Sequence, residues 1–406
     1  MTNQKSSIAI IGGGIGGLSA ALSLLRAGFD VHVNEQAPAL REVGAGLVIS
    51  PNASRILFSL GLGEAMESAG VAPLAWRQRR WRDGQTLLLS PMAAVMPPRF
   101  GHPLYTAHRA DILGMLVTAF PAERLHLGRK LSGILEIDDR VELSFDDGSA
   151  ADANIVIGAD GIHSTVRSLL FGQENPRFTG CVAYRGLVAA EKLAQLNLPL
   201  ESQLWMGPGK HFVHYPVSGG RLVNFVCLIE RESWTKESWT EPGEVADALN
   251  AYDGWHEQVR TIISAVEQTF VWGLFDREPL PRWSVGRVTL LGDACHPMLP
   301  FLAQGAAQAI EDAAVLTACL ANPGNDIADA LRRYERLRLP RTAKIQTIAR
   351  GNMTRNHLPD GPEQQKRDAE MAAGQAAWSI GATAWIYDYK ADEASETYLG
   401  LPPATL

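Results

Sequence analysis

Residues 8–35 read IAIIGGGIGGLSAALSLLRAGFDVHVNE. The apolar run Ile8–Ile11 predicts a short buried strand, and the glycines after it predict a sharp turn. Leu18–Arg26 has the composition of a helix that Gly28 ends, and Phe29–Glu35 predicts a second strand. The stretch therefore predicts a strand–helix–strand unit with parallel strands, the unit from which doubly wound α/β folds are built.

The glycine spacing in this unit points to a ligand. Gly12, Gly14 and Gly17 have the Gly-x-Gly-x-x-Gly spacing, and Glu35 ends the second strand. Such glycines permit the tight turn, the approach of a pyrophosphate and close helix packing, while the acid binds ribose hydroxyls. The pattern predicts a dinucleotide site rather than a merely glycine-rich turn. Nicotinamide and flavin dinucleotides both fit it, and the long loop after Glu35, rich in Gly and Pro, favours closure over a flavin ring.

A second strand-to-helix stretch, Arg287–Leu320, offers the other half of such a site. Its predicted strand Val288–Leu291 ends at Gly292 and Asp293, and an Ala-rich helix opens at Gly305 and Ala306. Small residues leave the N–H groups and the positive dipole end of that helix open to an anion, and the Asp293 carboxylate suits sugar or ribityl hydroxyls. Ordinary turn chemistry is the alternative for the Gly-Asp pair.

Two further residues, Asp160 and Arg109, are predicted to lie at the same dinucleotide site. The apolar strand Ile155–Gly158 is followed by Asp160 and by a helix that Ser164 caps. Arg109 follows a strand-like segment at the mouth of the same domain and suits a diphosphate, although a simple surface charge is equally consistent with the sequence.

The middle of the chain changes character. Residues 75–89 predict a hairpin that turns at Asp83-Gly84, and residues 181–275 predict several antiparallel strands. Alternation along one of these strands places His211 and Tyr215 on one face, about 7 Å apart. An imidazole and a phenol at that spacing are candidates for acid/base work on a ligand. Satisfied polar positions on a sheet surface are the alternative.

Composition excludes several classes of protein. The chain has 406 residues, 46% of them hydrophobic, and a net charge of −7, so it has a large core and no basic stripe for nucleic acid. We expect no membrane span, no metal site and a cytoplasmic location, since no signal pattern opens the chain. The cysteines lack metal-binding or disulfide spacing and are expected to be reduced: Cys181, Cys227, Cys295 and Cys319.

Together these motifs resemble the single-component FAD-dependent aromatic hydroxylases, the para-hydroxybenzoate hydroxylase class, over nearly the whole chain. Three segments are most similar to the salicylate hydroxylase, 3-hydroxybenzoate 6-hydroxylase and 6-hydroxynicotinate 3-monooxygenase groups: residues 43–47, His211–Pro216 and Trp385–Tyr387. Phe301 stands where the hydroxypyridine enzymes carry His, which argues against an assignment to hydroxynicotinate.

The resemblance implies roles for the candidate residues. Gly12, Gly14, Gly17 and Glu35 would hold the ADP part of FAD, Arg109 and Asp293 the diphosphate and ribityl region, and Ala45, Gly305 and Ala306 the flavin side. Asp160 is associated in the family with FAD and with the nicotinamide donor. His211 would deprotonate the substrate and Tyr215 would bind the oxyanion.

The implied reaction hydroxylates a small phenolic or hydroxypyridine acid with NADH or NADPH and O2, through a flavin C4a-hydroperoxide. The partners are therefore an aromatic substrate, O2 and NAD(P)H, for a monomer or homodimer. A monooxygenase of another heterocycle (urate-like), a non-hydroxylating flavin reductase and a flavin-loaded sensor remain alternatives, because a fold does not fix a function.

The implied fold class is α/β: a Rossmann-like FAD-binding domain, an inserted, mostly antiparallel β-sheet substrate domain and a C-terminal helical segment. We assign residues 1–74, 100–175 and 284–325 to the first, 75–99 and 176–283 to the second, and 326–406 to the third.

Overall fold

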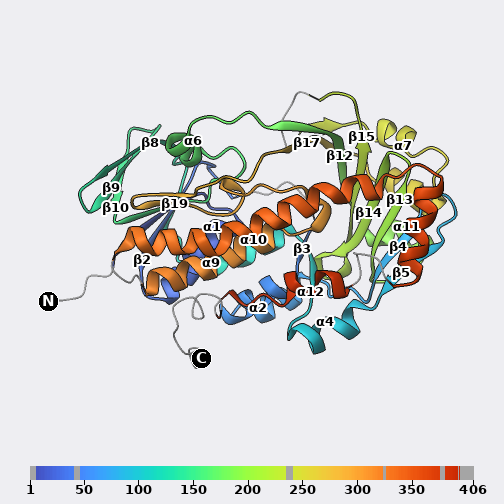
Figure 1. Cartoon of the computed structure of the whole chain (residues 1–406), viewed down its shortest axis with the longest axis horizontal. Helices are drawn as coiled ribbons and strands as arrows, with labels where there is room; N and C mark the ends of the chain where they lie inside the picture. The colour runs from blue at the N-terminus through green and yellow to red at the C-terminus, as the bar shows by residue number, and fades with distance from the viewer. Residues whose placement is uncertain are drawn as a thin grey trace.

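The structure, a computed structural model, describes residues 6–40, 46–234, 241–322, 326–374, 380–391 and 393. Two sheets lie at opposite ends of an elongated molecule, and a long helix, α10 (Ile327–Asn356), runs between them (Figure 1). The predicted α/β fold class, with its parallel sheet, antiparallel insert and C-terminal helices, is confirmed.

The first sheet has six strands in the order β18-β19-β11-β1-β2-β7. All its pairs are parallel except β18 with β19. The central strands are almost wholly buried, which is typical of parallel strands covered on both faces. The four strands predicted from the sequence are neighbours in this sheet. Their bounds and those of the two edge strands are β1 (Ser7–Ile11), β2 (Asp30–Glu35), β7 (Leu125–Leu127), β11 (Ile155–Gly158), β18 (Ser284–Val285) and β19 (Val288–Leu290).

Helices α1 (Ile15–Arg26) and α9 (Gly305–Ala321) pack against each other next to this sheet. Both start at the carboxyl end of a strand, β1 and β19, so their N-termini open toward the same edge of the sheet. That edge is where open α/β sheets bind ligands. The remaining elements of this half are α2 (Pro51–Ser59), α3 (Gly63–Ala69), α5 (Arg109–Ala119), α6 (Thr165–Phe171), the pair β3 (Gly46–Ile49) and β6 (Tyr105–His108), and the small sheet β8 (Leu131–Ile137), β9 (Arg140–Phe145) and β10 (Ala150–Ala153).

The second sheet has eight strands in the order β16-β17-β12-β15-β14-β13-β4-β5. Its pairs are antiparallel except β13 with β4, and the hairpin expected in residues 75–89 forms its far edge. The bounds are β4 (Trp76–Arg80), β5 (Thr86–Ser90), β12 (Arg177–Ala189), β13 (Ser202–Gly207), β14 (Lys210–Val217), β15 (Leu222–Glu230), β16 (Pro242–Gly243) and β17 (Thr269–Asp276). Residues of helices α7 (Val245–Ala251) and α8 (Glu257–Ser264) belong to one apolar cluster with Phe212 and Phe225 of this sheet.

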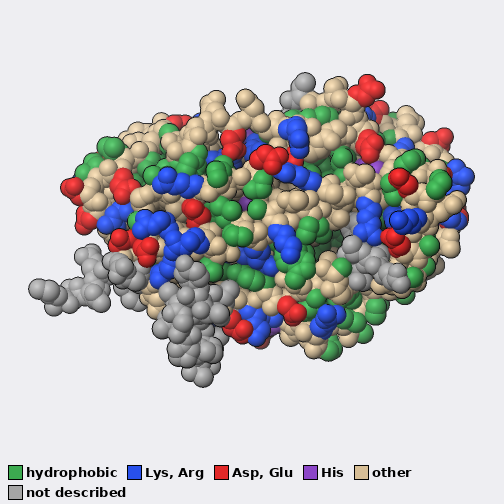
Figure 2. Space-filling view, in the orientation of Figure 1, with side chains coloured by type: hydrophobic (Ala, Val, Ile, Leu, Met, Phe, Trp, Pro, Cys, Tyr) green, Lys and Arg blue, Asp and Glu red, His purple; other side chains and the backbone are tan. Residues whose placement is uncertain are grey.

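The C-terminal part ties the two halves together. Helix α10 extends past the expected end at Arg350, and the polar stretch after it contains α11 (Pro362–Ala372), which packs on β5. Helix α12 (Ile380–Tyr387), from the aromatic tail, packs with α4 (Met92–Phe100) through Phe100 and Tyr387. On the face shown in Figure 2, Lys and Arg side chains are interspersed with Asp and Glu side chains. No described helix is long and apolar enough to cross a membrane.

Candidate active site

Two cavities meet between the sheets. One lies at the carboxyl edge of the parallel sheet and is lined by Gly12, Gly14, Glu35 and Asp160. The other, of about 310 Å³, lies between that edge and the eight-stranded sheet and is lined mainly by apolar side chains. Both cavities are lined by the same four junction residues, Arg109, Asp293, Gly305 and Ala306. A long ligand can therefore run from the glycine turn into the apolar chamber.

The glycine turn has no room for side chains at two of its three motif positions. A Cβ on Gly12, whose φ is +108°, would lie 2.4 Å from the carbonyl oxygen of Ala159, and one on Gly17 would lie 2.0 Å from that of Gly12. At Gly14, which precedes α1, an added Cβ would meet nothing within 4 Å. Gly12 and Gly17 thus hold strand and helix together, and Gly14 leaves open space before the helix N-terminus, as a pyrophosphate requires.

Two of the acids that line the first cavity, Glu35 and Asp160, accept different hydrogen bonds. Glu35 accepts hydrogen bonds from the backbone N–H groups of Gly13 (2.7 Å) and Ala37 (2.8 Å), which fix its carboxylate at the end of β2. Asp160 accepts from the Ser164 hydroxyl (2.5 Å) and from the backbone N–H of Thr165 (2.7 Å). Burial raises the pKa of Asp160. Its carboxylate therefore accepts hydrogen bonds at the start of α6 while it also lines the cavity.

Two of the junction residues, Asp293 and Gly305, lie after the end of β19 and at the start of α9. Asp293 lies in the short 3-10 turn η4 (Gly292–Ala294), and a Cβ on Gly305 would lie 3.9 Å from its Oδ1. The first turn of α9, all of it described, carries no acid, so its dipole is left for a ligand. Ala45, the remaining cofactor position, lies outside the described residues.

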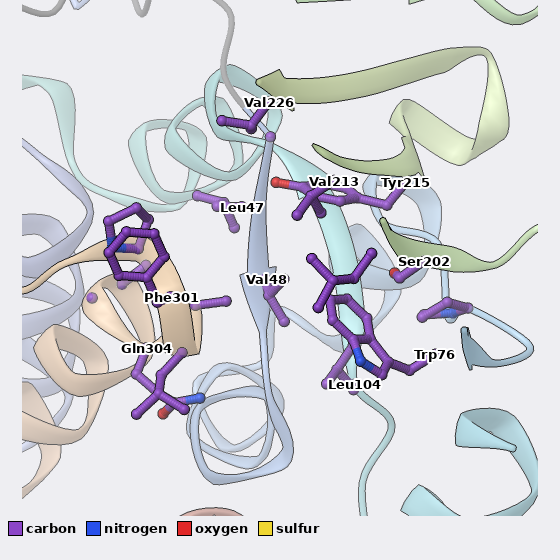
Figure 3. Close-up of a pocket in the computed structure, with 18 of the residues that line it drawn as sticks. Leu47, Val48, Trp76, Leu104, Ser202, Val213, Tyr215, Val226, Phe301 and Gln304 are labelled. Carbon is purple, nitrogen blue, oxygen red and sulfur yellow. The ribbon is translucent and has the colours of Figure 1, made fainter. Parts of the chain in front are cut away.

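Side chains of β14 form one wall of the apolar chamber. His211, Val213 and Tyr215 all line it, which confirms that they share one face of the strand. In Figure 3, Leu47 and Val48 of β3 lie between Phe301 and Gln304 on one side and Val213, Tyr215 and Ser202 on the other. The chamber is therefore lined by residues from both halves of the molecule.

His211 is 2% exposed and is held by a second histidine that the sequence did not indicate. Its Nδ1 lies 2.6 Å from Nε2 of His357, and Nδ1 of His357 lies 2.8 Å from a carboxylate oxygen of Glu230. Burial and the neighbouring His357 hold the pKa of His211 well below its usual range. His211 is therefore a neutral base near pH 7, and Nε2 is the ring nitrogen left for a ligand.

Tyr215 is packed where the two halves touch. A Cβ on Gly46 would lie 2.6 Å from the Tyr215 ring, and the Gly46 N–H donates to Asn224 at 2.7 Å. Burial raises the pKa of Tyr215 to about 12, against the opposing effect of Arg185. Its hydroxyl therefore keeps its proton and is suited to donate a hydrogen bond to an oxyanion.

Arg185 is a chamber residue that the sequence did not single out. It pairs in register with Val226, which pairs with Val213, so it shares the face of His211 and Tyr215. Its guanidinium lies 3.8 Å from the centre of the Trp272 ring, and burial lowers its pKa to about 9. Among the described residues that line the chamber, the cations are Arg109 and Arg185 and the acid is Asp293, so the lining favours an anion.

The comparisons with known proteins agree with this geometry. Residues 5–349 match the family model described as an FAD binding domain. The chain is 42% identical to a 3-amino-4-hydroxybenzoate 2-monooxygenase of Streptomyces platensis over 391 residues, which are 96% of this chain and 98% of that one. It is 39% identical to the 6-hydroxynicotinate 3-monooxygenase of Bordetella bronchiseptica over 362 residues, 88% of this chain and 94% of that one.

Two solved structures carry the same fold. A salicylate hydroxylase substrate complex has a TM-score of 0.81 at 29% identity and covers 100% of both chains. Klebsiella pneumoniae HpxO complexed with FAD and uric acid has a TM-score of 0.82 at 28% identity and covers 98% of both. The glycine turn that excludes side chains, the open helix N-termini and the chamber beyond them suit FAD. The chain belongs to the family of FAD-dependent aromatic hydroxylases, flavoprotein monooxygenases that the sequence had indicated.

Proposed function

We propose that this monooxygenase hydroxylates a small hydroxy-aromatic carboxylic acid of the 3-amino-4-hydroxybenzoate type, at a ring carbon activated by its electron-donating hydroxyl or amino substituents. The observation that carries the proposal is the neutral imidazole of His211 in an apolar chamber that continues directly from the dinucleotide cavity. A phenol becomes a much stronger nucleophile at its ortho and para carbons when it loses its proton.

The residues at the junction of the cavities would hold the cofactor. The glycine turn and Glu35 would bind the ADP part of FAD, while Arg109 and Asp293 would bind the diphosphate and ribityl groups. Gly305 and Ala306, at the N-terminus of α9, would face the flavin. Bound FAD supplies the transfer of electrons from NADH or NADPH and the activation of O2.

The chain's own part in the reaction is to prepare the ring. His211 would accept the phenolic proton on Nε2, and the Tyr215 hydroxyl would donate a hydrogen bond to the oxygen that becomes negative. Both groups are fixed on one rigid strand, and Phe301 packs 5.5 Å from the His211 ring, centre to centre. The ring would thus be held in one orientation with water excluded.

The carboxylate of the substrate would bind Arg185. A carboxylate that enters the chamber would offset the burial that lowers the pKa of this guanidinium, and a forked donor matches a carboxylate in shape. Arg185 lies two strands away from His211 on the same face, so the two groups would hold opposite ends of one small ring.

A substrate panel tests the proposal. FAD-loaded protein is mixed with NADH or NADPH and, in turn, 3-amino-4-hydroxybenzoate, 3-hydroxybenzoate, salicylate, 6-hydroxynicotinate and urate, and the mass of each product is measured. We expect product 16 Da heavier from a hydroxybenzoate, and none from its O-methyl ether, which has no phenolic proton. Hydroxylation of the ether at the rate of the phenol would overturn the role of deprotonation.

One observation favours a second candidate, an oxygenase of a urate-like heterocycle. The likeness to the HpxO complex with FAD and uric acid covers nearly the whole chain. Urate also loses a proton readily, so the same His211 would serve it. Turnover of urate, with no hydroxybenzoate turned over, would select this candidate; NADH oxidation without any oxygenated product would select a reductase.

The cytoplasmic location and the monomeric or homodimeric state stay predictions. Light scattering on the FAD-loaded protein measures the second directly.

A further inference from the structure

The substrate chamber is connected to the protein surface by a chain of titratable groups. His211 lines the chamber, His357 is 4% exposed, and the side chain of Glu230 is 50% exposed. The two contacts along this chain are 2.6 and 2.8 Å, both within hydrogen-bond range. The arrangement therefore leads from a buried base to water in two steps.

The backbone holds these three groups in register. His357 follows the last residue of α10, and its N–H donates to the carbonyl of Met353 at 3.1 Å. Its own carbonyl accepts from the N–H of Gly209, at the β13–β14 turn, and the carbonyl of Gly209 accepts from the N–H of Glu230. The end of a long helix is thus tied to the strand that carries His211.

We propose that His211, His357 and Glu230 form a proton path that carries the phenolic proton of the substrate out of the chamber. This inference rests on the proposed function of His211 as the base. His357 and Glu230 are positioning residues, since they act on the substrate only through His211.

The carboxylate of Glu230 sets the direction of the path. A carboxylate accepts from Nδ1–H of His357, so Nε2 of His357 accepts from Nδ1–H of His211, and Nε2 of His211 keeps its lone pair toward the ligand. When Nε2 takes the phenolic proton, His211 passes its Nδ1 proton to His357, and His357 passes its own to Glu230 and then to water. Each bond to hydrogen that breaks is matched by one that forms.

His357 is suited to the middle position. Burial lowers its pKa, while the hydrogen bond and charge of Glu230 raise it, so a proton on its ring is unfavoured but stabilised by the acid. The C-terminal end of α10 also favours positive charge there. A transient proton can therefore pass through without being trapped.

Stopped-flow mixing of FAD-loaded protein with 3-amino-4-hydroxybenzoate tests the path without turnover. Absorbance reports conversion of the bound phenol to phenolate, and a pH indicator reports proton release. We expect His357→Gln and Glu230→Gln to slow both signals about tenfold or more with the dissociation constant nearly unchanged. Glu230→Asp should restore much of the rate, and Glu232→Gln, which changes an exposed acid two residues away, should leave it at the wild-type value.

Equal rates in all these variants would overturn the path while leaving His211 as the base. A wild-type protein that does not bind the hydroxybenzoate would instead contradict the proposed substrate class. In that case NMR of 15N-labelled histidines in the ligand-free holoprotein decides the inference. The path requires that neutral His211 carries its proton on Nδ1 in the wild type, and that this tautomer is less favoured in Glu230→Gln. A proton on Nε2 of His211 in the wild type would overturn the path.

Discussion

At the scale of single residues, the proposed chemistry depends on His211 as the base that takes the phenolic proton. Replacement by Ala removes the ring nitrogen that would take the phenolic proton, so we expect turnover to fall by about 10²- to 10⁴-fold near neutral pH. The loss should shrink as the pH approaches the pKa of the free phenol, because the substrate then arrives already ionised. FAD content, measured by absorbance of the purified protein, should be unchanged.

The control for His211 is Phe301→Leu, which alters packing beside the imidazole without removing a titratable group. It should change the Michaelis constant more than the shape of the pH profile. Equal turnover of wild type and His211→Ala across the whole pH range would exclude His211 from the reaction.

Arg185 is the residue that we expect to bind the carboxylate of the substrate. Arg185→Gln should raise the Michaelis constant of a hydroxybenzoate roughly 10- to 100-fold, since a charge-assisted hydrogen bond contributes about 1.5–3 kcal/mol. For the amide of the same substrate, wild type and variant should differ little. An equal loss for acid and amide would mean that Arg185 supports the sheet through Trp272 rather than binding the carboxylate.

At the scale of elements, the glycine turn separates folding from cofactor binding. Gly17→Ala places a Cβ 2.0 Å from a backbone oxygen, so α1 must move, at a cost of about 1–3 kcal/mol in the stability of the apoprotein. In Gly14→Ala the added methyl group has space in the protein without cofactor, and the φ of −76° suits alanine, but the methyl group would occupy the proposed path of the pyrophosphate. The variant should melt like wild type without FAD and bind FAD far more weakly; normal FAD affinity in Gly14→Ala would place the pyrophosphate elsewhere.

Helices α9 and α10 are joined by a buried ionic cluster. Arg338 of α10 contacts Glu311 at 2.5 Å and Asp312 at 2.6 Å, all three side chains being fully buried. Burial opposes ionisation of Asp312, yet the charges of His296 and Arg338 hold its pKa at about 2. The pKa of Glu311 is also lowered against the effect of burial. Arg338→Met would leave Glu311 paired only with Arg341 and Asp312 only with His296, and should cost about 3–5 kcal/mol at pH 7.

The pH dependence of that cost has a definite sign. The folded-state pKa values of both acids lie below their unfolded values near 4. Their contribution to the free energy of unfolding is therefore complete above about pH 4 and is lost as the pH falls toward 2. Urea midpoints at fixed FAD concentration should therefore converge for wild type and Arg338→Met on acidification. Arg332→Met, which removes an exposed cation of the same helix, should stay within about 0.5 kcal/mol of wild type at every pH.

The sequence predicted elements whose signals are local. The strand Ile8–Ile11, the hairpin at Asp83-Gly84 and the shared face of His211 and Tyr215 follow from periodicity and turn residues, and each is present. His357 and Arg185 could not be found in this way. Their place beside His211 and in the chamber depends on how α10 meets β14 and on which strands pair, which are long-range facts without a local pattern.

At the scale of the whole molecule, the account depends on the two halves meeting at one continuous cavity. Glu35 and the glycine turn lie at its far end, while Arg109 and Asp293 line both of its parts. Strand β3 reaches across to Tyr215 and Asn224 of the eight-stranded sheet, and α12 lines the chamber from the C-terminal part. One ligand would therefore be in contact with segments from almost the entire chain. The reaction of the bound cofactor and substrate therefore tests whether all of these segments come together as described.

The most direct measurement is the origin of the oxygen in the product. FAD-loaded protein is supplied with NADH or NADPH and 3-amino-4-hydroxybenzoate under 18O2 in ordinary water. The account predicts a ring-hydroxylated product that carries one 18O atom and is formed in proportion to the reduced nucleotide consumed. A product with oxygen from water, or nucleotide oxidation that yields hydrogen peroxide alone with every aromatic acid of the panel, would contradict it.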